Sequence, residues 1–203
     1  MPFKKLHHHL LEVLAHFSIE KPTPFQKDSI PIIKSGANVF CIAPKDSGKT
    51  TTLILTTLNK LKCEASGNAP RAVVLVENKE KALELHDKFL EYTKQTSVRV
   101  YVGYKELHID IQKSEIFEGI DILVTTPTNL HKLFLTNGVS TSQLKICSIE
   151  DGDFVVQQSE YMAMLSVTQS IIKCQYVLYA EKAHPKLQRF EEFFMERAQH
   201  VKL

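Results

Sequence analysis

Short apolar runs alternate along the chain with longer segments of helical period, and this alternation restricts the possible folds more than any other feature. Several runs are rich in Val, Ile and Leu at nearly every position, which is typical of strands covered on both faces. Strands joined by helical connections of this length run parallel and are linked by right-handed crossovers. The pattern therefore predicts a doubly wound α/β domain with a mostly parallel sheet of about seven strands, flanked by helices.

The expected elements can be placed by residue number. The expected strands are 38–43, 71–76, 97–102, 121–125, 145–150 and 176–180, with a short one at 200–203. The expected helices are 4–17, 24–35, 49–62, 79–94, 105–118, 128–136, 157–173 and 184–198. A chain of 203 residues has the length of one ordinary domain, so we expect a single domain over 1–203.

Composition indicates a globular protein, with 43% hydrophobic and 24% charged residues. No apolar run approaches the roughly 20 residues that span a membrane, and the N-terminus lacks the apolar region of a signal peptide. The four cysteines are far apart without a CxxC pair, which favours free thiols in a reducing compartment. We therefore expect a cytoplasmic protein without membrane contact. A net charge of +2 is too small to argue for nucleic-acid binding by itself.

The stretch "CIAPKDSGKTT", residues 41–51, has the features of a phosphate-binding loop. It follows an apolar run and leads into a helical segment, so its backbone N–H groups and the helix N-terminus can face an anion. Lys49 would supply a charge at the β- and γ-phosphates, and the Thr50 hydroxyl could coordinate Mg²⁺. In doubly wound folds, ligands lie beyond the carboxyl ends of the strands, where this loop is expected.

Asp46 is the unusual residue of this loop, because glycine would be the easier choice at a tight turn. Asp reaches left-handed backbone conformations at modest cost, so the turn can form. Its carboxylate would still lie within several ångströms of a phosphate chain, and like charges at that range repel. We therefore expect weakened nucleotide affinity.

Several motifs in order make the chain similar to the first RecA-like domain of DEAD-box RNA helicases, over essentially its whole length. "SIEKPTPFQ" (18–26) resembles the family's Q motif, GFxxPTPxQ, and the loop resembles AxTGSGKT. The resemblance implies a P-loop NTPase fold, with the Q-motif region at 1–37 and the P-loop core at 38–203. It implies that Gln26 recognises adenine, with Phe3 as the upstream aromatic and Ile19 in place of a second one. The residues implied to bind ATP or ADP are Phe3, Ile19, Lys21, Gln26, Pro44, Lys45, Asp46, Ser47, Gly48, Lys49, Thr50 and Thr51.

"LKICSIEDGDF" (144–154) resembles the segment that contains the DEAD motif, "LKYLVLDEADR". The resemblance implies that Glu150 holds Mg²⁺ together with Thr50, and that Asp151 positions the attacking water. With Lys49, these two acids are the implied catalytic residues. Their side-chain lengths are exchanged relative to the family, and displacements of about 1 Å can cost about a hundredfold in rate.

"QYVLYAEK" (175–182) stands where the family has "QTLLFSAT", a segment that bonds the acidic motif and couples hydrolysis to duplex opening. Its hydroxyls are replaced in Ala180, Glu181 and Lys182, so we expect this coupling to be absent.

The segments that face RNA in the family are also altered. "LVENKEKALEL" (75–85) resembles "LVPTRELALQI", "YVGY" (101–104) keeps one glycine of a pair, and "VTTPTNL" (124–130) stands for TPGRL. The residues implied to contact RNA are Asn78, Lys79, Gly103, Thr126, Pro127 and Asn129. Lys79 keeps a positive charge but lacks the planar fork of arginine. We expect weak or conditional RNA binding.

Two functions remain open. The first is the ATP-binding half of a DEAD-box RNA helicase, weak or inactive alone because a second RecA-like domain, in cis or in trans, supplies arginine fingers. The second is a non-enzymatic nucleotide-binding or RNA- or protein-binding module derived from such a domain. Asp46 and the altered motifs favour the second, whereas the order of the motifs favours the first.

Overall fold

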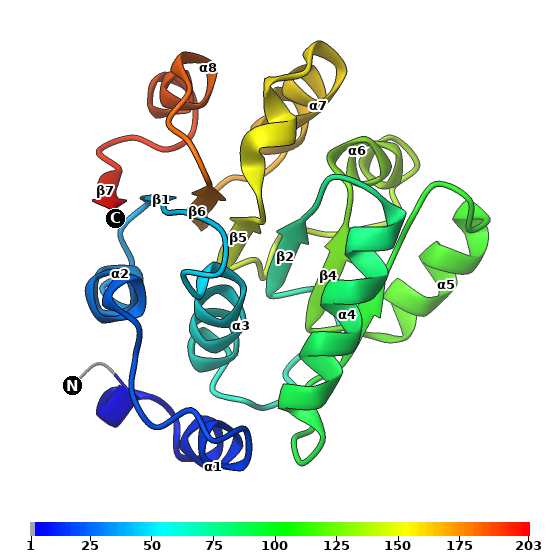
Figure 1. Cartoon of the computed structure of the whole chain (residues 1–203). Coiled ribbons are helices and arrows are strands. Elements are labelled where there is room, and N and C mark those ends of the chain that lie inside the picture. Colours follow the sequence, from blue (N-terminus) through cyan, green and yellow to red (C-terminus); the bar gives the residue numbers. More distant parts are fainter. Residues whose placement is uncertain (1–2) are drawn as a thin grey trace.

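A parallel sheet of seven strands forms the centre of the protein, as a computed structural model that describes residues 3–203 shows (Figure 1). The strand order is β3-β4-β2-β5-β6-β1-β7, and every pair of neighbours is parallel. The strands are β1 (Val39–Ile42), β2 (Ala72–Leu75), β3 (Val100–Val102), β4 (Ile122–Thr125), β5 (Ile146–Ile149), β6 (Gln175–Ala180) and β7 (Gln199–Lys202). The predicted doubly wound α/β fold is confirmed.

The helices connect the strands and cover the sheet. The α-helices are α1 (His8–His16), α2 (Pro24–Lys34), α3 (Lys49–Lys60), α4 (Lys79–Thr93), α5 (Ile109–Glu118), α6 (Pro127–Leu135), α7 (Gln158–Gln169) and α8 (Pro185–Gln188). Short 3₁₀ segments are η1 (Phe3–Lys5), η2 (Gly152–Val156) and η3 (Arg189–Glu192). None of the helices in 3–203 has the length and apolar character that crossing a membrane requires.

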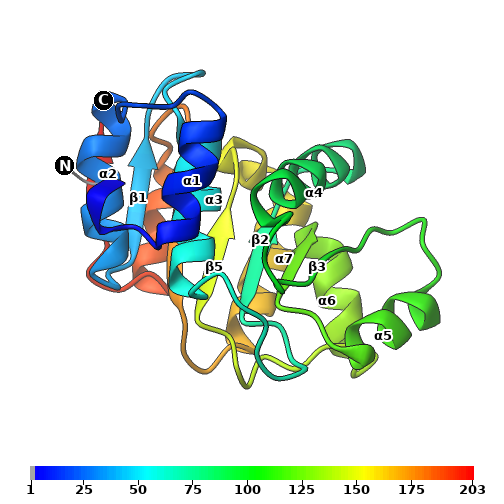
Figure 2. The ribbon, with the colours of Figure 1, turned by 90° about the horizontal axis from the view of Figure 1, so that it is seen from below.

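Two apolar clusters lie on the two faces of the sheet, because successive side chains of a strand point to opposite sides. On β1, Val39 and Cys41 pack into the cluster that contains residues of α1, α2, α3 and α4, whereas Phe40 packs into the other. That other cluster contains residues of α5, α6, α7 and α8. Figure 1 shows α7 and α8 on one side of the strands and α1, α2 and α3 on the other, and Figure 2 shows α1 and α3 over the same face. Both faces of the sheet are therefore covered, which explains the nearly continuous apolar runs.

The expected helix at 184–198 is wrong. The structure has the four-residue α8 (Pro185–Gln188), followed directly by η3 (Arg189–Glu192) and a loop. Phe190 and Met195 are fully buried here, and the amide of Met195 donates to the carbonyl of Phe190 across five residues. Burial of these two side chains decides the local path, because short segments depend on tertiary packing more than on helix propensity.

Asp121 holds together the edge of the sheet at which the strands begin. It immediately precedes β4, while Arg71 precedes β2 and Arg99 precedes β3. Its Oδ1 accepts from Arg71 Nη2 at 2.6 Å and from the Ser66 amide at 3.0 Å, and its Oδ2 accepts from Arg99 Nε at 2.9 Å. The side chain is 0% exposed. This buried carboxylate is fully partnered, which is the condition under which a buried charge is tolerated.

Candidate nucleotide-binding site

The loop between β1 and α3 has the backbone conformation of a phosphate-binding loop at two key positions. Gly48, the N-cap of α3, has φ 95° and ψ 21°, and a Cβ there would lie 2.7 Å from Gln26 Nε2. Glycine is therefore required both for the left-handed conformation and for the close approach of Gln26. Asp46 has φ 59°, so the expectation that an aspartate can occupy the left-handed turn is confirmed. The α3 helix begins at Lys49, which leaves its first N–H groups at the carboxyl edge of the sheet.

The Lys49 side chain lies inside the loop. Its Nζ donates to the carbonyl oxygens of Ala43 at 2.8 Å and Pro44 at 2.9 Å, and the residue is 7% exposed. These bonds keep a buried ammonium group partnered in the free protein. They also place its charge at the start of α3, where the helix dipole already favours an anion.

Residues of the Q-motif resemblance are bonded to this loop. Thr23 is the N-cap of α2 and forms a capping box with Gln26, in which each side chain bonds the backbone of the other. The Thr23 hydroxyl also donates to the Ser47 carbonyl at 2.7 Å, and Gln26 Nε2 reaches the Gly48 carbonyl at 3.5 Å. Gln26 is 3% exposed, so the start of α2 and the loop form one hydrogen-bonded unit.

The remaining residues predicted for the base side lie in the segment that precedes α2. Phe3 is buried in the apolar cluster on the α1 side of the sheet, and Ile19 packs against that cluster. Lys21 is exposed between α1 and α2. None of these residues lines the cavity at the phosphate loop described below.

Glu150 and Asp151 follow β5 directly and so lie at the same edge of the sheet as the loop. The Thr50 hydroxyl donates to Glu150 Oε1 at 2.7 Å, which brings together the two residues predicted to hold Mg²⁺. Glu150 is 8% exposed, and burial raises its pKa, while the bond from Thr50 partly opposes that shift and the charge of Asp151 adds to it. Asp151 adopts φ 45° and ψ 50°, a left-handed conformation that begins η2.

A hydroxyl and a carboxylate side by side fit Mg²⁺. This ion prefers oxygen ligands, and it is held by one or two protein groups plus phosphate and water. Within 3–203 no group of three or more His, Cys, Asp or Glu residues could hold a metal ion. Thr50 and Glu150 therefore suit a metal that arrives with a nucleotide.

The segment after β6 remains bonded to the acidic motif. The backbone amide of Glu181 donates to Asp153 Oδ2 at 2.9 Å. A backbone donor needs no particular side chain, so this contact forms without the hydroxyls that are missing at 180–182. The expected absence of coupling between hydrolysis and duplex opening stays a prediction.

These groups converge on one cavity of about 550 Å³ at the carboxyl edge. The cavity is lined by Lys45, Asp46, Gly48, Lys49, Thr50, Thr51, Lys81, Glu84, Leu85, Lys88, Glu150, Asp151 and Glu181. Four of these come from α4 and were not predicted, namely Lys81, Glu84, Leu85 and Lys88. These residues stand at positions i, i+3, i+4 and i+7, which puts them on one face of the helix. The helix follows β2, whose carboxyl end lies at the ligand edge, and these two facts together were the available signal.

The residues predicted to face RNA follow β2, β3 and β4, and none of them lines this cavity. Asn78 caps α4, with its Oδ1 accepting from the Lys81 amide at 3.0 Å, and Lys79 Nζ lies 4.8 Å from the centre of the Tyr104 ring. Thr126 caps α6 by accepting from the Asn129 amide at 3.2 Å, and Pro127 is the first helical residue. Asn78 and Thr126 are therefore the N-caps of α4 and α6.

Asn129 and Gly103 belong to a buried network that sequence reasoning did not find. Asn129 is 2% exposed, and its Nδ2 donates to Gln112 Oε1 at 2.8 Å and to Thr125 Oγ1 at 3.0 Å. Gln112 Nε2 in turn donates to the carbonyls of Tyr104 and Leu107. A Cβ on Gly103 would lie 2.7 Å from Gln112 Oε1, so the glycine makes room for this network. The Asn129 Nδ2 group is thus bonded within the protein, whereas its buried Oδ1 has no hydrogen-bond partner among the described residues.

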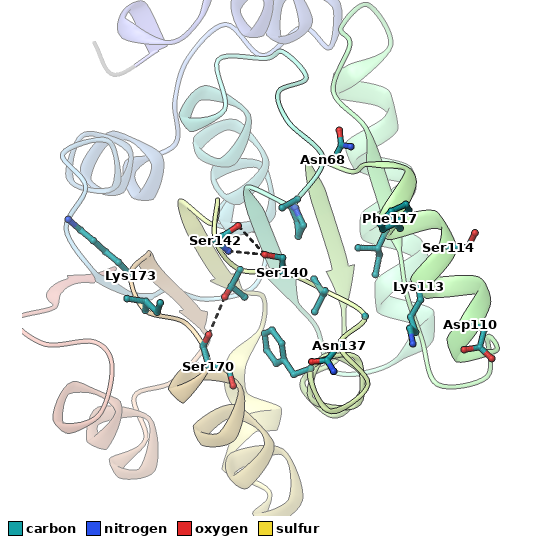
Figure 3. A pocket seen from close by; sticks show the side chains of 18 residues that line it. Asn68, Asp110, Lys113, Ser114, Phe117, Asn137, Ser140, Ser142, Ser170 and Lys173 are labelled. Carbon is teal, nitrogen blue, oxygen red and sulfur yellow. Dashed lines mark hydrogen bonds between the residues drawn. The ribbon is translucent and has the colours of Figure 1, made fainter.

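A larger hollow of about 1270 Å³ lies at the opposite edge of the sheet, between loops that precede β2, β5 and β6 (Figure 3). Its charged lining residues are Asp110, Lys113 and Lys173, and Phe117 and Ile172 on its wall are largely exposed. Unlike the cavity at the phosphate loop, this hollow is not lined by a helix N-terminus that carries a lysine next to two carboxylates. In doubly wound folds ligands bind at the carboxyl edge, so the cavity at the phosphate loop is the candidate site.

Known proteins of one family match this chain. A model of the DEAD/DEAH box helicase family matches residues 23–179. DEAD-box ATP-dependent RNA helicase 52A of Oryza sativa is 26% identical over 207 residues, which cover 92% of this chain and 34% of that protein. Probable ATP-dependent RNA helicase ddx42 of Dictyostelium discoideum is 30% identical over 147 residues, which cover 71% of this chain and 15% of that protein.

Solved structures show the same fold. A DEAD box protein from the hyperthermophile Methanococcus jannaschii matches with a TM-score of 0.88 at 16% identity, over 98% of this chain and 54% of that one. S. cerevisiae Dbp5 bound to RNA and ADP BeF3 matches with a TM-score of 0.84 at 18% identity, over 98% of this chain and 50% of that one. The chain thus spans about half the length of these solved chains and less of the curated relatives.

The sheet order and the loop at the start of α3 define a RecA-like domain of the P-loop class. The family model covers well over half of the residues, and the chain belongs to the DEAD/DEAH box helicase family. It corresponds to the N-terminal RecA-like domain of the DEAD-box RNA helicases that it matches.

Proposed function

We propose that this domain binds ATP or ADP together with Mg²⁺ at the cavity beside the phosphate loop. The observation that carries the proposal is that Lys49, Thr50, Glu150 and Asp151, which come from two distant segments, line one cavity at the N-terminus of α3. A lysine, a hydroxyl and two carboxylates at a helix N-terminus are the groups that phosphate and its metal ion require.

Each residue has a distinct role in this proposal. Lys49 exchanges its bonds to the Ala43 and Pro44 carbonyls for the β- and γ-phosphates, and the amides of Gly48 and its neighbours donate to phosphate oxygens. Thr50 and Glu150 hold the metal ion, which supplies charge neutralisation at the phosphates. Asp151 accepts the proton of the attacking water, and its shorter side chain limits how closely it can approach.

Adenine recognition is proposed for the Q-motif region, 1–37, which precedes a P-loop core at 38–203. Gln26 supports this role, because the capping box fixes its side chain beside Gly48. Phe3, Ile19 and Lys21 are proposed to complete the base side, the first two through apolar contact. Pro44, Ser47 and Thr51 belong to the loop that surrounds the phosphates.

RNA binding is proposed to be weak or conditional. Its support is the placement of Asn78, Lys79, Gly103, Thr126 and Pro127 after adjacent strands at one edge. Asn129 is proposed to belong to the same RNA-facing set, and the bonds of its Nδ2 to Gln112 and Thr125 fix its side chain there. A second RecA-like domain, in cis or in trans, is proposed to complete the site with arginine groups. The four free cysteines are compatible with the proposed cytoplasmic location.

An alternative function is a non-enzymatic nucleotide- or RNA/protein-binding module. The specific observation in its favour is the Thr50–Glu150 hydrogen bond, since the metal ligands bond each other and Glu150 is buried with a raised pKa. On this alternative, nucleotide binds weakly and is not hydrolysed. Turnover measured with and without RNA, and with a second RecA-like domain added, separates the two functions.

The direct test is calorimetric titration with Mg-ATP and with ADP. We expect Lys49→Ala to weaken the binding of both nucleotides roughly tenfold or more, because charged hydrogen bonds to phosphate are lost. Lys27→Ala is the matched control, since Lys27 is an exposed lysine on α2 outside the cavity. Circular dichroism verifies that both variants are folded. Absence of binding to either nucleotide by the wild-type protein would contradict the proposal.

A further inference from the structure

We propose that Lys81 and Lys88 on α4 form a second cationic wall of the phosphate cavity and contact the terminal phosphate of a bound nucleoside triphosphate. Glu84 holds both lysines while no nucleotide is present. This inference rests on the proposed nucleotide binding and adds two lysines that the motif resemblance did not assign to the site.

The helix geometry places the three side chains on one face. Residues at i, i+3 and i+7 of an α-helix lie above one another, and Lys81, Glu84 and Lys88 have this spacing on α4. All three line the cavity that Lys49, Thr50, Glu150 and Asp151 also line. The α4 lysines therefore share the phosphate and acid end of the site, and none of the base-side residues Phe3, Ile19, Lys21 and Gln26 lines this cavity.

Glu84 pairs with both lysines in the free protein. Lys88 Nζ lies 2.7 Å from Glu84 Oε1, and Lys81 Nζ lies 3.6 Å from Glu84 Oε2. The hydrogen bond from Lys88 lowers the pKa of Glu84. The three side chains are 43–52% exposed, so these pairs are screened by solvent and exchange readily for a stronger anion.

The charges of the cavity explain why these lysines are needed. The carboxylates that line it are Asp46, Glu84, Glu150, Asp151 and Glu181, and the lysines are Lys45, Lys49, Lys81 and Lys88. With only Lys45 and Lys49, five carboxylates would face the incoming phosphates, and the repulsion would oppose binding. Lys81 and Lys88 bring the two signs close to balance, so the α4 side compensates for the acidic substitution at Asp46.

The test compares a double variant with a matched control. Lys81→Ala/Lys88→Ala removes both charges, and Lys94→Ala removes an exposed lysine at the end of the same helix, outside the cavity. Affinities for ADP and for a non-hydrolysable Mg-ATP analogue are measured by calorimetry. We expect the double variant to bind the triphosphate analogue about tenfold more weakly and ADP about twofold more weakly, with Lys94→Ala unchanged. Lys88→Arg should bind almost as wild type does.

Two further variants and probes sharpen the test. Glu84→Gln frees both lysines and should tighten binding of the triphosphate analogue, and equal affinity would overturn the role given to Glu84. If wild type binds nucleotide but the double variant matches Lys94→Ala, the inference is overturned while the proposed function stands. If the double variant loses only the binding of a single-stranded RNA oligonucleotide, the lysines serve RNA and the inference is likewise overturned. If wild type binds no nucleotide, the proposed function itself fails.

Discussion

Two buried carboxylates at opposite edges of the sheet have contrasting surroundings. Asp121, where the strands begin, accepts hydrogen bonds from two arginine side chains and from the amides of Ser66 and Arg99. Burial acts against its charge, yet these bonds hold its pKa below the usual range. Glu150, where the strands end, has one hydrogen bond, from Thr50, and burial raises its pKa. The first carboxylate is saturated with partners and the second is not.

The difference separates a structural charge from one that is available for binding. A carboxylate with every lone pair satisfied gains nothing from a new ligand, and its removal leaves buried partners unpaired. A buried carboxylate with a single neutral partner is poorly solvated, and a metal cation would stabilise it. Burial alone therefore does not identify a functional acid. The number and charge of its partners do.

The largest effect that tests this comparison is on stability. We expect Asp121→Asn to lower the free energy of unfolding by about 3 kcal/mol or more, because two arginines lose their shared partner. Glu150→Gln is the matched control and should change stability by about 1 kcal/mol or less, since only one neutral hydrogen bond is altered. Urea titration followed by circular dichroism measures both variants. Equal losses would show that the two carboxylates are not distinct in this way.

The pH dependence of stability should differ in sign between the two sites. The pKa of Asp121 is lowered by folding, so its contribution is complete above the unfolded value of about 3.9 and is lost as pH falls through the folded pKa. The pKa of Glu150 is raised by folding, so its contribution is present below about 4.3 and is lost as pH rises through the folded pKa.

Thermal unfolding between pH 3 and pH 8 measures this difference. The melting temperature of Glu150→Gln relative to wild type should increase as pH rises above roughly 4 and then level off. The deficit of Asp121→Asn should shrink at the acidic end of the range. A Glu150→Gln difference that is constant with pH would contradict the raised pKa.

The smallest effect is expected for Asp46, an exposed carboxylate at the phosphate edge. Asp46→Gly should tighten nucleotide binding roughly threefold at low salt, because it removes a like charge and glycine accepts φ 59° without strain. Asp46→Asn is the control that keeps a side chain suited to this conformation. Both variants should tighten binding, and the gain should shrink at about 0.5 M salt. If neither changes the affinity, the carboxylate points away from the phosphates.

Most of the fold was predictable because strands that are buried on both faces appear in the sequence as short, continuous apolar runs. Few other structures explain such runs when they alternate with helical segments. The edge that carries the site followed from the parallel strands, whose carboxyl ends form the ligand edge in doubly wound folds. The meeting of Thr50 with Glu150 was implied by the family resemblance. The replacement of the expected helix at 184–198 by α8, η3 and a loop was not predictable. It depends on the packing of Phe190 and Met195 against residues that are distant in the sequence. The buried hydrogen bond of Asn129 was not predictable either, because its partner Gln112 lies on another helix. Lys81 and Lys88 of α4 were not predicted, because a sequence motif gives positions along the chain and does not show which face of a helix lines a cavity.

The Thr23 hydroxyl connects the region proposed to bind the base of a nucleotide with the loop proposed to bind its phosphates. It caps α2 by accepting from the Gln26 amide, and at the same time it donates to the Ser47 carbonyl of the phosphate loop. A loop that rearranges around phosphate must therefore alter the N-cap that orients Gln26, and a change at Gln26 must alter the loop. By thermodynamic linkage, occupancy of the base side and occupancy of the phosphate side would change each other's affinity by the same factor. A single hydroxyl group would thus make recognition of the base and of the phosphates cooperative.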